Sequence, residues 1–216
     1  MSNIFIYGEK EIQHLKSVDS ALGAIIDEIG PIERKVIPDL FTALANSIVG
    51  QQISSKAFDT VWGRFTKRFP NITPEAVHSS PIEEIQQCGM SMRKASYIKE
   101  AAATIVAGEL DIDELYTLSD EEVVKKLSSL HGVGVWTAEM ILTFSLQRPN
   151  VMSWGDLAII RGLRMLYRHR KIDKKLFQKY KRRYSPYASV ASLYLWEISK
   201  GTCNLKDYAP KQNKSK

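Results

Sequence analysis

The chain has 216 residues, of which 44% are hydrophobic, enough for a real core in one large domain or in two small lobes. No segment approaches the ~20 consecutive apolar residues of a membrane span. The first residues lack the basic and apolar regions of a signal peptide, so we expect a cytoplasmic protein, nucleoid-associated in a prokaryote. Cys88 and Cys203 fit a reducing compartment and are too few for a four-cysteine iron–sulfur site.

The net charge of +6 is unevenly spread along the chain. Eleven Lys and Arg residues and a single acid, Asp173, lie between Arg161 and Arg183, which leaves the rest of the chain at a net charge of −4. This imbalance favours a polyanionic partner for the segment. A solvated helix face is the alternative interpretation.

Apolar residues at helical spacing predict four helices before residue 70. Residues 9–29 form two of them, with a break near 17–19 where Ser17 or Asp19 can cap the second. The other two cover 39–49 and 54–68. Between these two, Gly50-Gln51-Gln52-Ile53 forms a short corner, in which Gln51 and Gln52 are by type ordinary corner residues that hydrogen-bond to the backbone.

Short helices are expected at 73–77 and 81–87, and longer ones at 91–107, 119–129 and 135–146. The helix at 91–107 turns Ile105 and Val106 inward. Arg93 and Lys94, near its start, are either phosphate contacts or a solvated pair. The helix at 135–146 is apolar nearly all round, which is typical of the centre of a packed helical protein.

Gly132 and Gly134 lie between the helical patterns at 123–130 and 135–146, so a tight hairpin joins two helices. Glycine tolerates positive φ and close backbone approach. The hairpin amides and the open N–H groups of the next helix form an anion site suited to phosphate. A plain helix–helix turn is the alternative.

Asp156 follows Gly155 and immediately precedes an apolar helix at 157–168, which makes it a helix N-cap by type and place. Capping alone is the alternative to a chemical role. Helices at 174–183 and 186–199 follow, and the polar, basic tail from 206 is expected to be disordered. No stretch of any length has the period of a strand, so the predicted fold class is all-α.

Five motifs in this order resemble those of the helix-hairpin-helix (HhH-GPD) DNA glycosylase superfamily, and most closely its 3-methyladenine DNA glycosylase II, or alkylation-repair, branch. They are Gly50-Gln51-Gln52-Ile53-Ser54, Gly89-Met90-Ser91-Met92-Arg93-Lys94-Ala95, Leu130-His131-Gly132-Val133-Gly134-Val135-Trp136-Thr137-Ala138, Gly155-Asp156-Leu157-Ala158 and Pro186-Tyr187-Ala188-Ser189-Val190-Ala191. The resemblance implies a two-lobed fold without an N-terminal β domain. One lobe, 40–148, contains the hairpin; the other combines 1–39 with 149–216 and carries Asp156.

The resemblance implies roles for individual residues. Asp156 would be the catalytic carboxylate, and Gln52 would be the wedge that fills the gap left by a flipped nucleotide, with Gln51 beside it. Trp136 and Trp196 fall at aromatic positions of the alkylbase pocket, with core packing as the alternative. Trp154 either walls the pocket or anchors its loop, and Met140 stands where some relatives have another pocket aromatic.

Trp136 also occupies the position at which bifunctional members of the superfamily carry a Schiff-base lysine, so hydrolysis without lyase chemistry is implied. The resemblance assigns DNA binding to the hairpin residues His131, Gly132, Val133, Gly134 and Thr137. It further implies a structural Na⁺ or K⁺ at the backbone carbonyls of Ser128, Leu130 and Val133, and no other cofactor. His131 replaces the usual proline, and Ala188 replaces a usual arginine.

The implied activity is that of a monofunctional DNA glycosylase, acting as a monomer on damaged double-stranded DNA in base excision repair. It would flip out alkylated purines, 3-methyladenine first and 7-methylguanine after it, and hydrolyse their glycosidic bond to leave an abasic site. One rival is a glycosylase for an oxidised or deaminated base. The other is a non-catalytic DNA-binding protein that retains only the hairpin.

Overall fold

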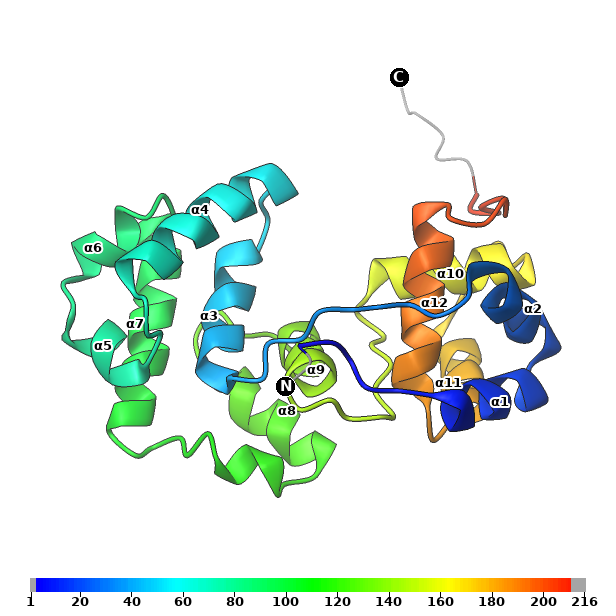
Figure 1. Ribbon diagram of the computed structural model, residues 1–216, viewed down its shortest axis with the longest axis horizontal. Coiled ribbons are helices and arrows are strands. Elements are labelled where there is room, and N and C mark those ends of the chain that lie inside the picture. Colours follow the sequence, from blue (N-terminus) through cyan, green and yellow to red (C-terminus); the bar gives the residue numbers. More distant parts are fainter. Residues whose placement is uncertain (1–2, 211–216) are drawn as a thin grey trace. The chain divides into compact units, whose positions relative to one another are not determined.

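The structure is a computed structural model that describes residues 3–210. In it the chain folds into helices joined by loops (Figure 1). No strand occurs within these residues, only an isolated antiparallel bridge between Ile4 and Lys35, so the all-α prediction is confirmed. The chain divides into two compact units, Ile37–Leu146 and the combination of Met1–Val36 with Gln147–Lys216. The lobe boundaries expected at 40 and 148 differ from these by two or three residues.

The unit Ile37–Leu146 contains seven α-helices and one short 3₁₀ helix. They are α3 (Leu40–Gly50), α4 (Ser55–Arg68), α5 (Pro74–Ser79), α6 (Ile82–Gln86), α7 (Met92–Val106), η1 (Glu114–Tyr116), α8 (Asp120–Ser128) and α9 (Val135–Phe144). Helix α7 packs against α3, α5 and α6, while α9 packs against α3 and α8. Asp39 and Ser54 cap α3 and α4 with their side chains, which fixes where these helices start.

One expectation about burial in this unit is wrong, and another holds for most of a helix but not for its first turn. Val106 is exposed and not turned inward, and the three residues that follow it are exposed as well. Helix α9 buries Ala138, Ile141 and Leu142, but its first turn exposes Val135 and Trp136. An all-round apolar helix is therefore central along most of its length, while its N-terminus reaches the surface of the unit.

The second unit contains α1 (Glu9–Val18), α2 (Ser20–Ile29), α10 (Leu157–Tyr167), α11 (Lys174–Tyr184) and α12 (Ala188–Lys200). Helix α12 is buried along most of its length and packs against all four of the others. It crosses α10 closely at Gly162, where a Cβ atom would lie 2.4 Å from the backbone oxygen of Leu195. Only glycine permits this approach, which sets the position of α10 against α12.

A buried polar cluster joins α2, α10 and α11. Asp19 caps α2 and also accepts hydrogen bonds at 2.6 Å from the Tyr167 hydroxyl and from the Arg183 guanidinium. The hydroxyls of Tyr167 and Tyr184 lie 2.5 Å apart, and burial raises the pKa of both tyrosines. Because every charged or hydroxyl group named here has a partner, the cluster holds α11 rigidly to the core of its unit.

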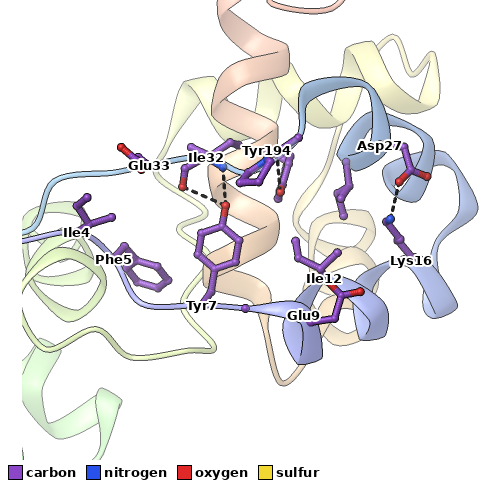
Figure 2. A pocket seen from close by; sticks show the side chains of 14 residues that line it. Ile4, Phe5, Tyr7, Glu9, Ile12, Lys16, Asp27, Ile32, Glu33 and Tyr194 are labelled. Atoms are coloured by element: carbon purple, nitrogen blue, oxygen red, sulfur yellow. Dashed lines mark hydrogen bonds and ion pairs between the residues drawn. The ribbon is translucent and has the colours of Figure 1, made fainter. Parts of the chain in front are cut away.

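A pocket of about 520 Å³ lies between the N-terminal segment, α1 and α2 (Figure 2). Tyr7 points across it, where its hydroxyl donates to the backbone oxygen of Ile32 at 3.0 Å and accepts from the Ile32 N–H at 2.6 Å. Tyr194 donates to the oxygen of Gly30 at 3.1 Å, and Lys16 pairs with Asp27 at the rim. The lining does not include Asp156, so this pocket is distinct from the candidate site below.

The chain after α12 returns to α10. Asp207 accepts hydrogen bonds from Arg164 at 2.8 and 3.0 Å, which hold the pKa of its carboxyl below the ordinary value. The expected disorder therefore does not begin at 206; the remainder of that expectation, residues 211–216, lies outside the described residues. Among residues 3–210, no helix is long and apolar enough to cross a membrane.

Candidate active site

Asp156 is the N-cap of α10, as its position in the sequence predicts. Its Oδ1 accepts hydrogen bonds from the backbone N–H groups of Ala158 at 2.8 Å and Ile159 at 3.0 Å. The residue is only 6% exposed. Two open donors at the helix start thus fix one carboxylate oxygen, and the positive end of the helix dipole lies beside the negative charge.

Trp196 of α12 holds the other oxygen. Its indole Nε1–H donates to Asp156 Oδ2 at 3.1 Å. Trp196 follows Leu195, the residue that Gly162 approaches closely, so the crossing of α10 and α12 places the indole within reach of the carboxylate. This hydrogen bond was not expected from the sequence, which indicated only that Trp196 stacks or packs.

Trp154 and Leu157 flank the carboxylate with exposed apolar surface. Trp154 is 40% exposed and packs edge-on against Phe177 of α11, with ring centroids 5.2 Å apart. This contact supports the loop-anchor interpretation of Trp154. Leu157, at the first position of α10, is 83% exposed. The sequence did not indicate this exposure, because the apolar residues that follow Leu157 predict a buried helix face.

The two hairpin glycines differ in what they require. Gly132 has φ +80°, and a Cβ atom there would lie 2.1 Å from the Tyr97 ring, so both conformation and packing demand glycine. Gly134 has φ −92°, and a Cβ atom there would meet nothing within 4 Å. Only Gly132 therefore uses the positive φ that glycine permits, while Gly134, the N-cap of α9, leaves open space in front of the first turn of that helix.

The other predicted hairpin contacts are not equally accessible. His131 is exposed, with its Nδ1 2.8 Å from Glu100 Oε2. Val133 and Thr137 are buried, so their side chains pack inside the unit. Only their backbone groups remain for a bound ion or phosphate.

The corner before α4 is tied to the hairpin. Gln51 Nε2 donates to the backbone oxygen of Gly132 at 2.8 Å, so its side chain is committed within the unit. Gln52 is exposed and has φ +53°, an uncommon conformation for a residue with a side chain. The two glutamines therefore differ: the side chain of Gln51 links the corner to the hairpin, whereas the side chain of Gln52 is exposed to solvent.

Lys94 locks this corner, a role that the sequence did not indicate. Its Nζ donates to the backbone oxygens of Val49 at 2.9 Å and Gln51 at 2.6 Å, which lie at the C-terminal end of α3. Burial lowers the pKa of Lys94. Two of its three N–H donors are therefore used within the unit, a role that neither interpretation of its sequence position included.

Trp136 and Met140 lie one turn apart on α9. Trp136 is 45% exposed, and Met140 is half-buried. Both belong to the unit Ile37–Leu146, together with the corner and the hairpin, whereas Asp156, Trp154 and Trp196 belong to the other unit. The predicted site residues are thus divided between the two units.

The hairpin also carries the residues expected to hold a monovalent cation. The Oγ atom of Ser128 is buried without a hydrogen-bond partner among the described residues. The backbone oxygen of Leu130 accepts from the Val133 N–H at 3.1 Å and retains a second lone pair. The unpaired atom is the Ser128 hydroxyl and not one of the three predicted carbonyl ligands, and it is compatible with a cation at this hairpin. Within residues 3–210, no group of three His, Cys, Asp or Glu side chains is placed to hold a metal ion.

The family model for the HhH-GPD superfamily of base excision DNA repair proteins matches residues 45–186. The chain belongs to this superfamily. Its sequence is 32% identical to DNA-3-methyladenine glycosylase 1 of Schizosaccharomyces pombe, over 93% of this chain and 91% of that protein. It is 28% identical to a putative DNA-3-methyladenine glycosylase of Bacillus subtilis, over 87% of this chain and 69% of that protein.

Solved structures show the same fold. The crystal structure of DNA-3-methyladenine glycosidase from Bacillus halodurans superposes with a TM-score of 0.83 at 33% identity, covering 96% of this chain and 97% of that one. The S. pombe 3-methyladenine DNA glycosylase in complex with abasic DNA gives 0.77 at 31% identity, covering 89% and 97%. The predicted helix-hairpin-helix glycosylase fold and the superfamily resemblance are both confirmed.

Proposed function

We propose that this protein hydrolyses the N-glycosidic bond of alkylated purines in double-stranded DNA, 3-methyladenine first and 7-methylguanine after it, and leaves an abasic site. The observation that carries the proposal is the Asp156 carboxylate, held at both oxygens beside exposed apolar side chains. The relatives named DNA-3-methyladenine glycosylase support the choice of substrate.

Breaking the bond between base and sugar builds positive charge on the deoxyribose, as in other glycoside hydrolyses. A carboxylate fixed by three donors stabilises that charge without having to reorganise, and its Oδ atoms can orient the attacking water. The C1′–N bond breaks with its electron pair leaving on the base, the water oxygen bonds to C1′, and the water proton passes to Asp156 or to solvent.

A purine alkylated at a ring nitrogen is already cationic, so it departs as a neutral base and needs little protonation. One carboxylate without a second acid is therefore sufficient for this substrate. Because Trp136 supplies no amine, water is the nucleophile, and we expect no imine intermediate and no strand cleavage.

The base pocket follows from the same assignment. Trp136, exposed at the start of α9, stacks on the flipped base, and its π face attracts the positive charge at ~0.5–2 kcal/mol. Met140 lies one turn further along α9. Trp196 acts mainly through its hydrogen bond to Asp156, and Trp154 anchors the loop that carries this residue.

DNA is held by the other unit. The open space at Gly134 lets a phosphate approach the N–H groups at the start of α9, with His131 beside it, and Gln52 fills the gap left by the flipped nucleotide. The carbonyls of Ser128, Leu130 and Val133 would hold a monovalent cation that bridges the hairpin to a DNA phosphate. We expect the protein to act as a monomer.

The decisive experiment compares release of methylated bases from alkylated duplex DNA by wild type and Asp156→Asn. Asparagine also caps helices, so this variant keeps the fold while losing the charge. We expect release by wild type and almost none by the variant. Equal release would remove Asp156 from its role, and no release by wild type would favour a DNA-binding protein without catalysis.

Two further measurements test the choice of damaged base and the role of water as the nucleophile. Wild type is incubated with duplexes that carry an oxidised or a deaminated base, where preferential release would overturn the alkylated-purine assignment. Borohydride is then added to a reaction on alkylated DNA. A protein–DNA adduct trapped by reduction would contradict hydrolysis by water.

A further inference from the structure

The basic segment between Arg161 and Arg183 is only partly neutralised by the fold. Arg161 and Arg164 pair with Asp207, and Arg183 pairs with the buried Asp19. No carboxylate of the described residues forms an ion pair with the other eight basic side chains, and all of these except the half-buried Lys181 are exposed: Arg168, Arg170, Lys171, Lys174, Lys175, Lys179, Lys181 and Arg182.

Helix α11 arranges three of these charges in a line. Its inner face consists of Phe177, Tyr180 and Tyr184, all buried. Lys175, Lys179 and Arg182 follow at the i, i+4 and i+7 spacing on the opposite face, and we call them the outer row. At 1.5 Å per residue the row extends over about 10 Å, roughly the rise of three phosphates along one strand of B-DNA at ~3.4 Å each.

This arrangement costs helix stability. Like charges three and four residues apart repel each other. Basic residues in the first turn, here Lys174 and Lys175, also oppose the helix dipole, and α11 contains no acid to offset them. Stability therefore does not explain the outer row, whereas an external polyanion would.

The outer row stands on a rigid support in the same unit as Asp156. The rings of Tyr167 and Tyr180 stack at 4.3 Å, and Arg183 and Tyr184 tie α11 to the buried Asp19 cluster. Phe177 contacts Trp154, two residues before Asp156. Charges on such a support bind a regular polyanion without a large loss of backbone freedom.

We propose that the outer row binds the phosphates of duplex DNA outside the base-flipping site, and so attaches the protein to DNA regardless of sequence or damage. The inference rests on the proposed function for the choice of DNA as polyanion. The outer face of α11 presents no apolar side chain among Lys175, Gln178, Lys179 and Arg182, which argues against a membrane surface.

The test compares the triple variant Lys175→Ala/Lys179→Ala/Arg182→Ala with a matched control, Lys10→Ala/Lys35→Ala/Lys67→Ala. The control removes the same charge from exposed positions elsewhere. Binding to an undamaged 30-base-pair duplex is measured by fluorescence anisotropy between about 50 and 200 mM salt, where each lost phosphate contact reduces the slope of log K against log salt by ~0.9.

We expect the slope of the outer-row variant to fall by about 2 to 3 and that of the control to stay within about 0.5 of wild type. Equal slopes for the two variants would overturn the proposal. So would binding to anionic phosphatidylserine vesicles that the outer-row variant loses while its DNA slope is unchanged.

Two further measurements separate this inference from the function of the site. Single-turnover base release with saturating enzyme is expected to be the same in the outer-row variant and wild type; if wild type releases no base, the proposed function fails, while the slopes still decide this proposal. Alanine favours helix and relieves the repulsion, so the variant is expected to melt no lower than wild type. Weaker DNA binding with a lower melting temperature would indicate a damaged fold and overturn the proposal.

Discussion

Replacing Trp196 by phenylalanine keeps a smaller aromatic ring on α12 and removes the N–H that donates to Asp156 Oδ2 at 3.1 Å. The two backbone hydrogen bonds to Oδ1 remain, so the aspartate still caps α10. Oδ2 loses its hydrogen bond from α12, so the carboxylate is held less firmly. The Oδ2 atom that faces the attacking water and the deoxyribose in the proposed reaction is then less well ordered.

A hydrogen bond to a charged group contributes about 1.5–3 kcal/mol. If about 1.4 to 2.7 kcal/mol of this is expressed in the transition state, the rate of base release falls by about 10-fold to 100-fold. Affinity for alkylated DNA stays close to wild type, because the ring is retained. The assay is single-turnover release of 3-methyladenine with enzyme in excess, together with a binding titration on the same duplex.

The control is the double variant Asp156→Asn/Trp196→Phe, compared with Asp156→Asn alone. If Trp196 acts through Asp156, removing the indole N–H costs nothing further once the carboxylate is gone. The same fold-loss in both backgrounds would refute this reasoning. So would a Trp196→Phe protein that keeps the wild-type rate and loses affinity, because stacking alone would then account for the tryptophan.

Three other substitutions give sharp expectations. Gly132→Ala should lower the free energy of unfolding in urea by about 2 to 4 kcal/mol, because the positive φ and the Tyr97 ring both oppose a Cβ. Gly134→Ala should change stability by less than about 0.5 kcal/mol and weaken DNA binding; equal destabilisation by both would contradict the distinction. Asp207→Asn should destabilise by about 1 kcal/mol at pH 7. The hydrogen bonds from Arg164 lower the pKa of Asp207, so that difference should shrink as the pH falls below the ordinary value of 3.8 and through the lower folded value; a difference that grows as the pH falls below 3.8 would contradict this reasoning.

The features that the sequence predicted well are those in which cause and effect lie a few residues apart. The starts of α3, α4 and α10 follow from capping side chains at Asp39, Ser54 and Asp156, each bonded to an N–H two or three residues later. Both partners of such a contact lie within three residues of each other, so a residue type and a short spacing are enough to predict it. The same capping rule places Asp156 at the start of α10, where the candidate site lies.

The features that it missed depend on contacts between distant parts of the chain. The bond from Trp196 to Asp156 spans forty residues, and Lys94 reaches Val49 and Gln51 across forty-five and forty-three. No spacing rule predicts which of several tryptophans or lysines makes such a contact. The two hairpin glycines are identical in sequence, and only the Tyr97 ring, more than thirty residues earlier, makes one of them indispensable.

Asp156 has a structural and a proposed chemical role in the same carboxylate, and the choice of substitution decides which one is measured. In Asp156→Asn, the amide oxygen can still accept from Ala158 and Ile159, which turns the amide NH₂ toward the Trp196 N–H. Two donors then face each other, and the loss of the hydrogen bond between these side chains costs about 1–3 kcal/mol. Trp196→Phe removes that conflict, so it should stabilise the Asn variant while destabilising wild type. Thermal unfolding of the four proteins checks this reversal of sign, and a loss of stability in both backgrounds would show that the indole contributes packing and not this hydrogen bond.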